Sequence, residues 1–141
     1  MTMNLPGFES TNSSPVTPKG KDVFLVDNVE YIEESDAYKL TYRMHKANRK
    51  HVEYYRRSVA FQINALGNML RAAYKNNTLV KFTPAMLINA VGRQFEGEIV
   101  HSEWQGKKRA NINAFSYKPV NALYSFVTEN DDVILDGEPV A

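Results

Sequence analysis

The chain has 141 residues, enough for one domain with a single hydrophobic core and flanking segments. It contains no cysteine, which excludes disulfides and thiolate metal sites and fits a cytoplasmic protein. No window is apolar enough for a membrane span, and the first residues lack the basic and apolar regions of a secretion signal.

The small net charge of +1 hides a strong segregation of charge along the chain. Residues 38–118 carry 15 basic and four acidic side chains, a balance of +11, whereas all five charges after Lys118 are acidic. A basic body favours a polyanionic partner such as a nucleic acid, although it can also serve solubility alone.

The predicted elements begin with a flexible, polar and proline-containing arm over residues 1–21. Three β-strands follow over residues 22–32, 37–45 and 51–57. The alternation of apolar and polar residues is clearest in the second strand, and the third is rich in tyrosine and arginine.

Two helices are predicted after the third strand. Ser58 is expected to cap a helix whose apolar residues recur at helical spacing as far as Ala73. Thr83 as N-cap, Pro84 as the first helical residue and Gly92 after the last turn predict a second, shorter helix.

Two further strands over residues 94–117 are joined at Gln105 and Gly106, and residues 121–141 form an acidic tail. Three strands, a helical insert and two strands together favour a mainly β fold. We predict a five-stranded Greek-key barrel of the oligonucleotide-binding (OB) type over residues 22–120, with its helical insert between strands 3 and 4.

The tip of the last hairpin carries Trp104 beside three cations, Lys107, Lys108 and Arg109. Single-stranded nucleic acid offers a phosphate track for cations and π-faces on which an aromatic ring can stack. We therefore predict that the hairpin forms part of a strand-binding groove, on the barrel rim made by the loop between strands 4 and 5. The alternative is that Trp104 caps a small core and the cations keep a sheet edge soluble.

The third strand supplies further candidates. Tyr54 and Tyr55 are neighbours and so point to opposite sides, which lets only one stack on a base while the other enters the core. Arg56 and Arg57 likewise point to opposite sides of the strand, unless the strand end twists and leaves both side chains in solvent. Other cations of the second and third strands are candidates for following the DNA backbone, or simply belong to a solvated turn: Arg43, His45, Lys46, Arg49 and Lys50.

On the last strand, Phe115 and Tyr117 are predicted to share a ligand-facing side with Asn111 and Asn113. The opposite side, formed by Ala110, Ile112 and Ala114, suits a tightly curved barrel interior. The alternative places Phe115 in the core.

A tyrosine-rich strand and the helix ALGNMLRAAY precede a more specific pattern between Phe95 and Phe115. This pattern consists of an F-x-G-x-I strand, an aromatic residue, a short Gly-Lys turn and a strand that contains N-x-F. Residues 52–120 thereby resemble bacteriophage single-stranded DNA-binding proteins. The resemblance implies an OB barrel that coats single-stranded DNA during phage replication or recombination in the host cytoplasm. It also implies an acidic tail that recruits replication or recombination proteins, but the ending ILDGEPVA lacks the Asp-x-x-Pro-Phe terminus of bacterial single-stranded DNA-binding proteins.

Two other classes of function have partial support in the sequence. Glu96 and Glu98 have the spacing of paired carboxylates that hold Mg²⁺ in nucleases, but no third acid with a following lysine completes such a set. We therefore expect no enzyme activity, no metal and no cofactor. A protein-binding adaptor would use the tyrosines as anchors and the basic strip for an acidic partner. The sequence leaves homo-oligomerisation open.

Overall fold

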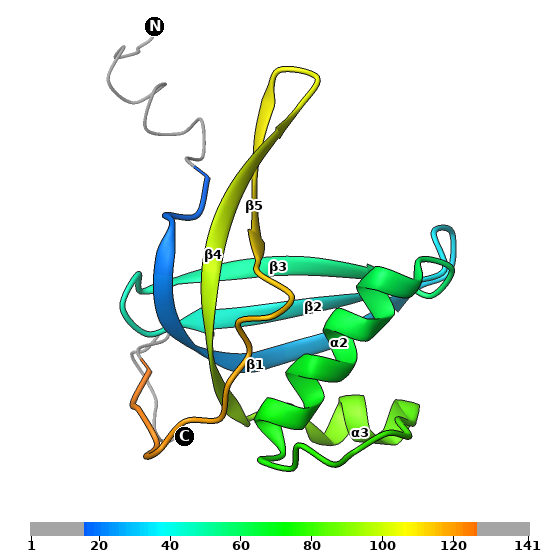
Figure 1. The fold of residues 1–141 in the computed structure, drawn as a ribbon, viewed down its shortest axis with the longest axis vertical. Coiled ribbons are helices and arrows are strands. Elements are labelled where there is room, and N and C mark those ends of the chain that lie inside the picture. Colours follow the sequence, from blue (N-terminus) through cyan, green and yellow to red (C-terminus); the bar gives the residue numbers. More distant parts are fainter. Residues whose placement is uncertain (1–15, 127–141) are drawn as a thin grey trace, which may run out of the picture.

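The computed structural model describes residues 16–126, apart from the side chain of Trp104. Five antiparallel strands form one sheet in the order β3-β2-β1-β4-β5, and it curls into a half-barrel (Figure 1). Two helices lie between β3 and β4. The elements are β1 (Gly20–Ile32), β2 (Ala37–Met44), β3 (Arg49–Arg56), α2 (Ala60–Ala73), α3 (Pro84–Asn89), β4 (Gln94–Trp104) and β5 (Lys107–Ile112). The predicted mainly β class and element order are confirmed, and the arrangement is consistent with an OB-like fold.

β1 is the central strand and belongs to both halves of the curled sheet, since it pairs with β2 on one side and with β4 on the other. Its residues 24–32 pair with β2, and its residues 20–25 pair with β4. The register with β2 shifts between Val26 and Asn28, which leaves Asp27 as an extra residue. Because such a bulge increases local twist, it allows one long strand to serve both halves of the curl.

The core inside the curl is built around three fully buried aromatic rings. The Phe24 and Phe95 rings stack with centroids 5.3 Å apart, and Tyr42 meets them edge-on at 6.0 Å and 5.2 Å, respectively. Gly97 of β4 leaves room for this packing, since a Cβ there would lie 3.1 Å from a methyl carbon of Ile112 and 3.3 Å from the Phe24 ring.

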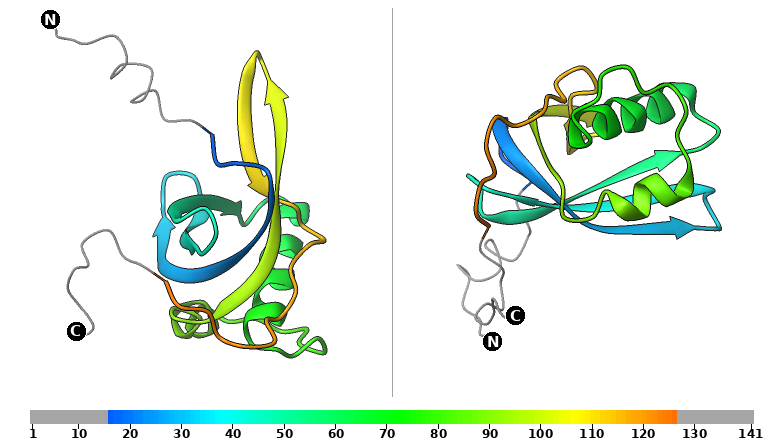
Figure 2. Two further views of the ribbon diagram at one scale, coloured as in Figure 1. Left: turned by 90° about the vertical axis from the view of Figure 1, so that its left-hand side faces the viewer. Right: turned by 90° about the horizontal axis from the view of Figure 1, so that it is seen from below.

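The two helices lie on one side of the curled sheet (Figure 2). Leu66, Met69 and Leu70 of α2 are buried against the core. The prediction that Ser58 caps α2 is wrong, because the N-cap is Val59, with no side-chain cap; instead the Gln62 side chain accepts a hydrogen bond from the backbone N of Arg56 at 2.7 Å. The predicted cap of α3 is confirmed, since Thr83 Oγ1 accepts from the backbone N of Met86.

Residues 113–126, after β5, run past α2 and return to the beginning of β4 (Figure 1). Lys118 forms an isolated backbone β-bridge with Glu96. The Gln94 side chain donates a hydrogen bond of 2.8 Å to the Tyr124 carbonyl and accepts one of 2.9 Å from the backbone N of Tyr124. Residues 121–126 of the predicted tail are thus attached to the sheet, whereas residues 1–15 and 127–141 lie outside the described residues. No helix within residues 16–126 is long and apolar enough to cross a membrane.

Candidate nucleic-acid interface

The seam between β3 and β5 is where the curled sheet fails to close by backbone pairing, since these two strands are its edges. A buried carboxylate bridges them instead. Glu53 of β3 accepts hydrogen bonds from the backbone N of Ile112 at 2.7 Å and from the Asn111 side chain at 3.3 Å. One side chain therefore holds the two edges together at this level.

Glu53 is the centre of a longer polar chain. His51 Nε2 lies 2.7 Å from Glu53 Oε2, and His51 Nδ1 lies 3.0 Å from the Thr17 hydroxyl. The Thr17 carbonyl accepts a hydrogen bond of 2.6 Å from His101 Nε2 on β4. These contacts attach the segment before β1 to β3 and to β4. Because buried polar groups are costly without partners, the chain of contacts favours one fixed spacing between β3 and β5.

A groove of about 820 Å³ lies along this seam, and we call it the seam groove. Tyr54 lines it together with cations from both strands, Arg49 and Arg56 from β3 and Lys108 and Arg109 from β5. Its described lining contains no carboxylate. Since a low-dielectric concave surface with one sign of charge concentrates counter-ions, the groove suits a narrow polyanion.

The pleat of β3 sends the two neighbouring tyrosines to opposite sides of the strand, as expected. The side chain of Tyr54 is 53 % exposed, whereas that of Tyr55 is 2 % exposed and lies in the core. Tyr55 OH is 2.9 Å from both Tyr42 OH and Tyr117 OH. Burial raises the pKa of all three phenols, so they stay neutral and act as a hydrogen-bonded core element. Tyr55 is therefore not available for stacking on a base, whereas Tyr117 is partly buried, with its ring against Phe95 at 5.3 Å between centroids.

The second of the two strands predicted within residues 94–117 ends earlier than expected. β5 stops at Ile112 because Asn113 begins a turn. The Asn113 side chain accepts a hydrogen bond of 2.9 Å from the backbone N of Phe115, and the Asn113 carbonyl accepts one of 3.0 Å from the backbone N of Ser116. The predicted shared face of Asn111, Asn113, Phe115 and Tyr117 is therefore wrong beyond β5. Phe115 is 81 % exposed, so it is not a core residue.

Two of the predicted cations, Arg43 and Lys50, are neutralised by a carboxylate. Arg43 Nε lies 3.3 Å from Asp27 and Lys50 Nζ lies 3.9 Å from the same carboxylate. Lys39 pairs with Glu30 at 3.9 Å. We call the surface formed by these three cations and the two acids, Asp27 and Glu30, the outer face. Its charges largely cancel.

The loop between β1 and β2 holds another neutralised cation. Arg57 lies 3.1 Å from Asp36 in an exposed ion pair. Hydrogen bonding from the Tyr31 hydroxyl, reinforced by Arg57, lowers the pKa of Asp36, so that this carboxylate remains charged. Arg57 is therefore directed to the loop, whereas the neighbouring Arg56 lines the seam groove.

The β4–β5 hairpin extends beyond the other strands (Figure 2). Gln105 and Gly106 both have positive φ, 51° and 76°, as a tight two-residue turn requires, so the predicted turn is confirmed. The side chains of Lys107, Lys108 and Arg109 are exposed. Trp104 pairs with Lys107 in the backbone register, and its side chain lies outside the described part of the structure.

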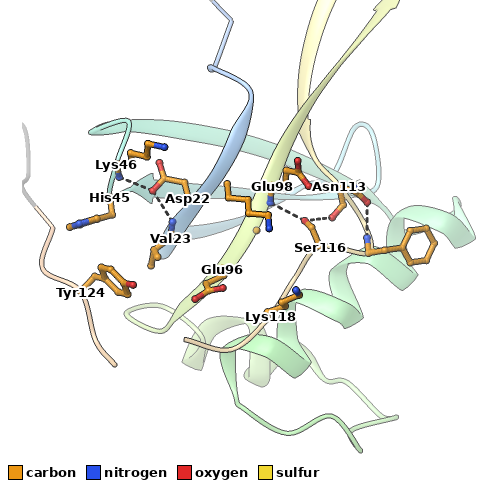
Figure 3. Close-up of a pocket in the computed structure, with 13 residues that line it drawn as sticks. Asp22, Val23, His45, Lys46, Glu96, Glu98, Asn113, Ser116, Lys118 and Tyr124 are labelled. Carbon is orange, nitrogen blue, oxygen red and sulfur yellow. Dashed lines mark hydrogen bonds between the residues drawn. The ribbon is translucent and has the colours of Figure 1, made fainter. Parts of the chain in front are cut away.

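A second concavity of about 480 Å³, which we call the mixed-charge hollow, lies between β1, β4, the β2–β3 turn and residues 113–124 (Figure 3). Asp22 organises the turn here by accepting hydrogen bonds from the backbone N of Lys46 at 2.7 Å and of Ala47 at 2.9 Å. Lys46 lines this hollow and not the seam groove. The charged residues that line it are of both signs: Lys21, Lys46, Lys118, Asp22, Glu96 and Glu98. Among residues 16–126, no three His, Cys, Asp or Glu side chains are grouped so that they could hold a metal ion.

Sequence reasoning missed four residues of this region: Thr17, His51, Glu53 and Phe61. A signal existed for Glu53 and His51, because both occupy inward positions of an alternating strand, where an ionisable side chain needs a partner. Phe61 lies outside the apolar stripe of α2, which marks it as an exposed ring. The contact of Thr17 with the seam has no local signal.

Comparison with protein-family models and with curated proteins finds no match to this chain.

Proposed function

We propose that this protein is a sequence-tolerant single-stranded DNA-binding protein that acts in phage DNA replication or recombination. Its strands would form a five-stranded Greek-key OB barrel, in which the Glu53 bridge takes the place of a β3–β5 ladder. The seam groove is the observation that carries the proposal, because it combines cations from both strands with an exposed tyrosine and a described lining free of carboxylates.

The chemistry of the groove favours an unpaired strand over a duplex. Cations such as Arg56 and Lys108 can follow phosphates, and the Tyr54 ring can stack on a base face. Base faces are hidden inside a duplex, so only unpaired bases gain this stacking energy. Neither contact reads base edges, and the binding is therefore tolerant of sequence.

The test is the salt dependence of binding to a fluorescent oligo(dT), measured by anisotropy, with a duplex of equal length as the control. Each phosphate contact on a single strand adds about 0.7 to the slope of log K against log salt, so Arg56 and Lys108 alone should give a slope of about 1.4 or more. The duplex should bind more weakly. Oligo(dT) binding that is absent, or unchanged by salt, would contradict the proposal.

The open edges of β3 and β5 favour one second candidate, an adaptor that captures an extended acidic peptide by adding it to a strand edge. This candidate predicts that a polyglutamate peptide displaces oligo(dT) from the protein at equal concentrations. The DNA-binding proposal predicts that such a peptide competes weakly, because it offers no base faces to Tyr54.

A further inference from the structure

Two phenylalanine rings meet on the surface beside the seam groove. Phe61 of α2 and Phe115, after β5, are 61 % and 81 % exposed, and their ring centroids are 6.3 Å apart at an interplanar angle of 69°. Rings this exposed add little to the core, and adjacent exposed aromatics in a soluble domain typically mark a binding surface.

The pair is continuous with the seam groove. Tyr54 lines both the seam groove and a neighbouring hollow of about 430 Å³, and Phe61 also lines that hollow. Phe115 lines a further hollow of about 480 Å³ on the flank of α2, together with Arg71 and Lys75. A chain leaving the groove at Tyr54 therefore reaches Phe61, then Phe115, then these two cations.

The charge of this flank suits a polyanion. No acidic residue occurs between Glu53 and Glu96 in the sequence, and two of the cations in this stretch, Arg71 and Lys75, line the flank hollow. The guanidinium of Arg71 is held in place by hydrogen bonds to the Leu79 carbonyl at 2.7 Å and to the Asn68 side chain at 2.8 Å.

The other side of Phe115 is less suitable for phosphates. There the ring borders the mixed-charge hollow, in which Glu96 and Glu98 accompany the lysines. The described lining of the α2 flank hollow has no carboxylate. Because, of these two hollows, carboxylates line only the mixed-charge hollow in the described part of the chain, a DNA strand that passes Phe115 is favoured to continue across α2.

We propose that Phe61 and Phe115 form a second base-stacking subsite, over which single-stranded DNA leaves the seam groove and passes its phosphates to Arg71 and Lys75. This inference rests on the proposed function and extends it, since it gives the bound strand a path and a longer footprint. The occupant is unpaired DNA because the flank offers cations beside aromatic rings, the two features that such a strand uses.

The test compares two oligo(dT) lengths, about 5 and about 15 nucleotides, near the ends of the range that one OB domain covers. Phe115→Ala and Phe61→Ala should each weaken binding of the longer oligonucleotide about tenfold, the loss expected for one stacked base, and leave the shorter one, held in the seam groove, unchanged. Ile88→Ala, at a 66 % exposed position of α3, is the control for loss of an exposed apolar side chain and should change neither affinity.

A charge-matched pair tests the direction of the path. Lys75→Gln should reduce the salt slope for the longer oligonucleotide by about 0.7, whereas Lys81→Gln, which removes the same charge from an exposed position in the same insert, should leave the slope unchanged. Because all the replaced side chains are exposed, thermal melting should be the same for every variant.

Wild-type affinity of both phenylalanine variants for the longer oligonucleotide would overturn the inference while leaving the seam groove intact, and would assign the ring pair to a protein partner. Failure of the wild-type protein to bind either oligonucleotide would overturn the proposed function and this inference together.

Discussion

The seam groove and the outer face both carry cations from β3, yet only one of them has an electrostatic character that suits DNA. On the outer face, Lys39, Arg43 and Lys50 each lie within 4 Å of Asp27 or Glu30, at 3.9, 3.3 and 3.9 Å. The described lining of the seam groove has cations and no carboxylate. The positions of a few acids, rather than the number of cations, therefore decide which surface attracts a polyanion.

The largest effect should come from removing the side chain that holds the seam together. Glu53→Ala leaves the backbone N of Ile112 and the His51 ring without their buried partner, so the free energy of unfolding should fall by about 3 kcal/mol. Urea unfolding followed by circular dichroism measures this change.

Glu30→Ala is the matched variant on the outer face. It breaks an exposed pair with Lys39, so stability should change by less than about 1 kcal/mol. Equal losses from the two variants would mean that Glu53 is not a structural bridge between β3 and β5.

The next effect in size concerns the ring in the groove. Tyr54→Ala should weaken oligo(dT) binding by about 1–3 kcal/mol, the usual contribution of one stacked base, with little change in stability because the ring is exposed. Tyr31→Ala, which removes a ring of similar exposure outside the groove, should leave the affinity unchanged. Anisotropy titrations compare the oligo(dT) affinities of the two variants. Equal affinities would mean that Tyr54 does not stack on a base in the groove.

The smallest effect distinguishes the cations of the two regions. Lys108→Ala should lower the salt slope of oligo(dT) binding by about 0.7, because it removes one phosphate contact. Lys50→Ala should leave the slope unchanged, since this cation lies beside Asp27, which retains Arg43 as its partner. If both variants lowered the slope equally, DNA would not be confined to the seam groove.

Much of the fold could be predicted because it follows from local patterns. Alternation along β2 and β3, the Thr83 cap of α3 and the tight turn at Gln105 and Gly106 each depend on neighbouring residues alone. The end of β5 could not be placed in this way, because an asparagine side chain competes there with continued pairing.

The site was less accessible to sequence reasoning because it depends on contacts across the fold. The opposite orientations of Tyr54 and Tyr55 follow from the pleat, but which of them is buried depends on the distant Tyr117. The neutralisation of Arg43 depends likewise on Asp27, which is 16 residues away and lies at a bulge in β1. Counting charges along the sequence cannot separate the two surfaces.

The central claim, that unpaired DNA occupies the seam between β3 and β5, is tested most directly by backbone amide NMR of ¹⁵N-labelled protein titrated with oligo(dT). The account predicts chemical-shift changes concentrated in residues 49–56 and 107–111, with the amides of Asp27 to Glu30 on the outer face nearly unmoved. Shift changes centred on residues 27–30 and 39–43, or none at saturating oligonucleotide, would contradict it.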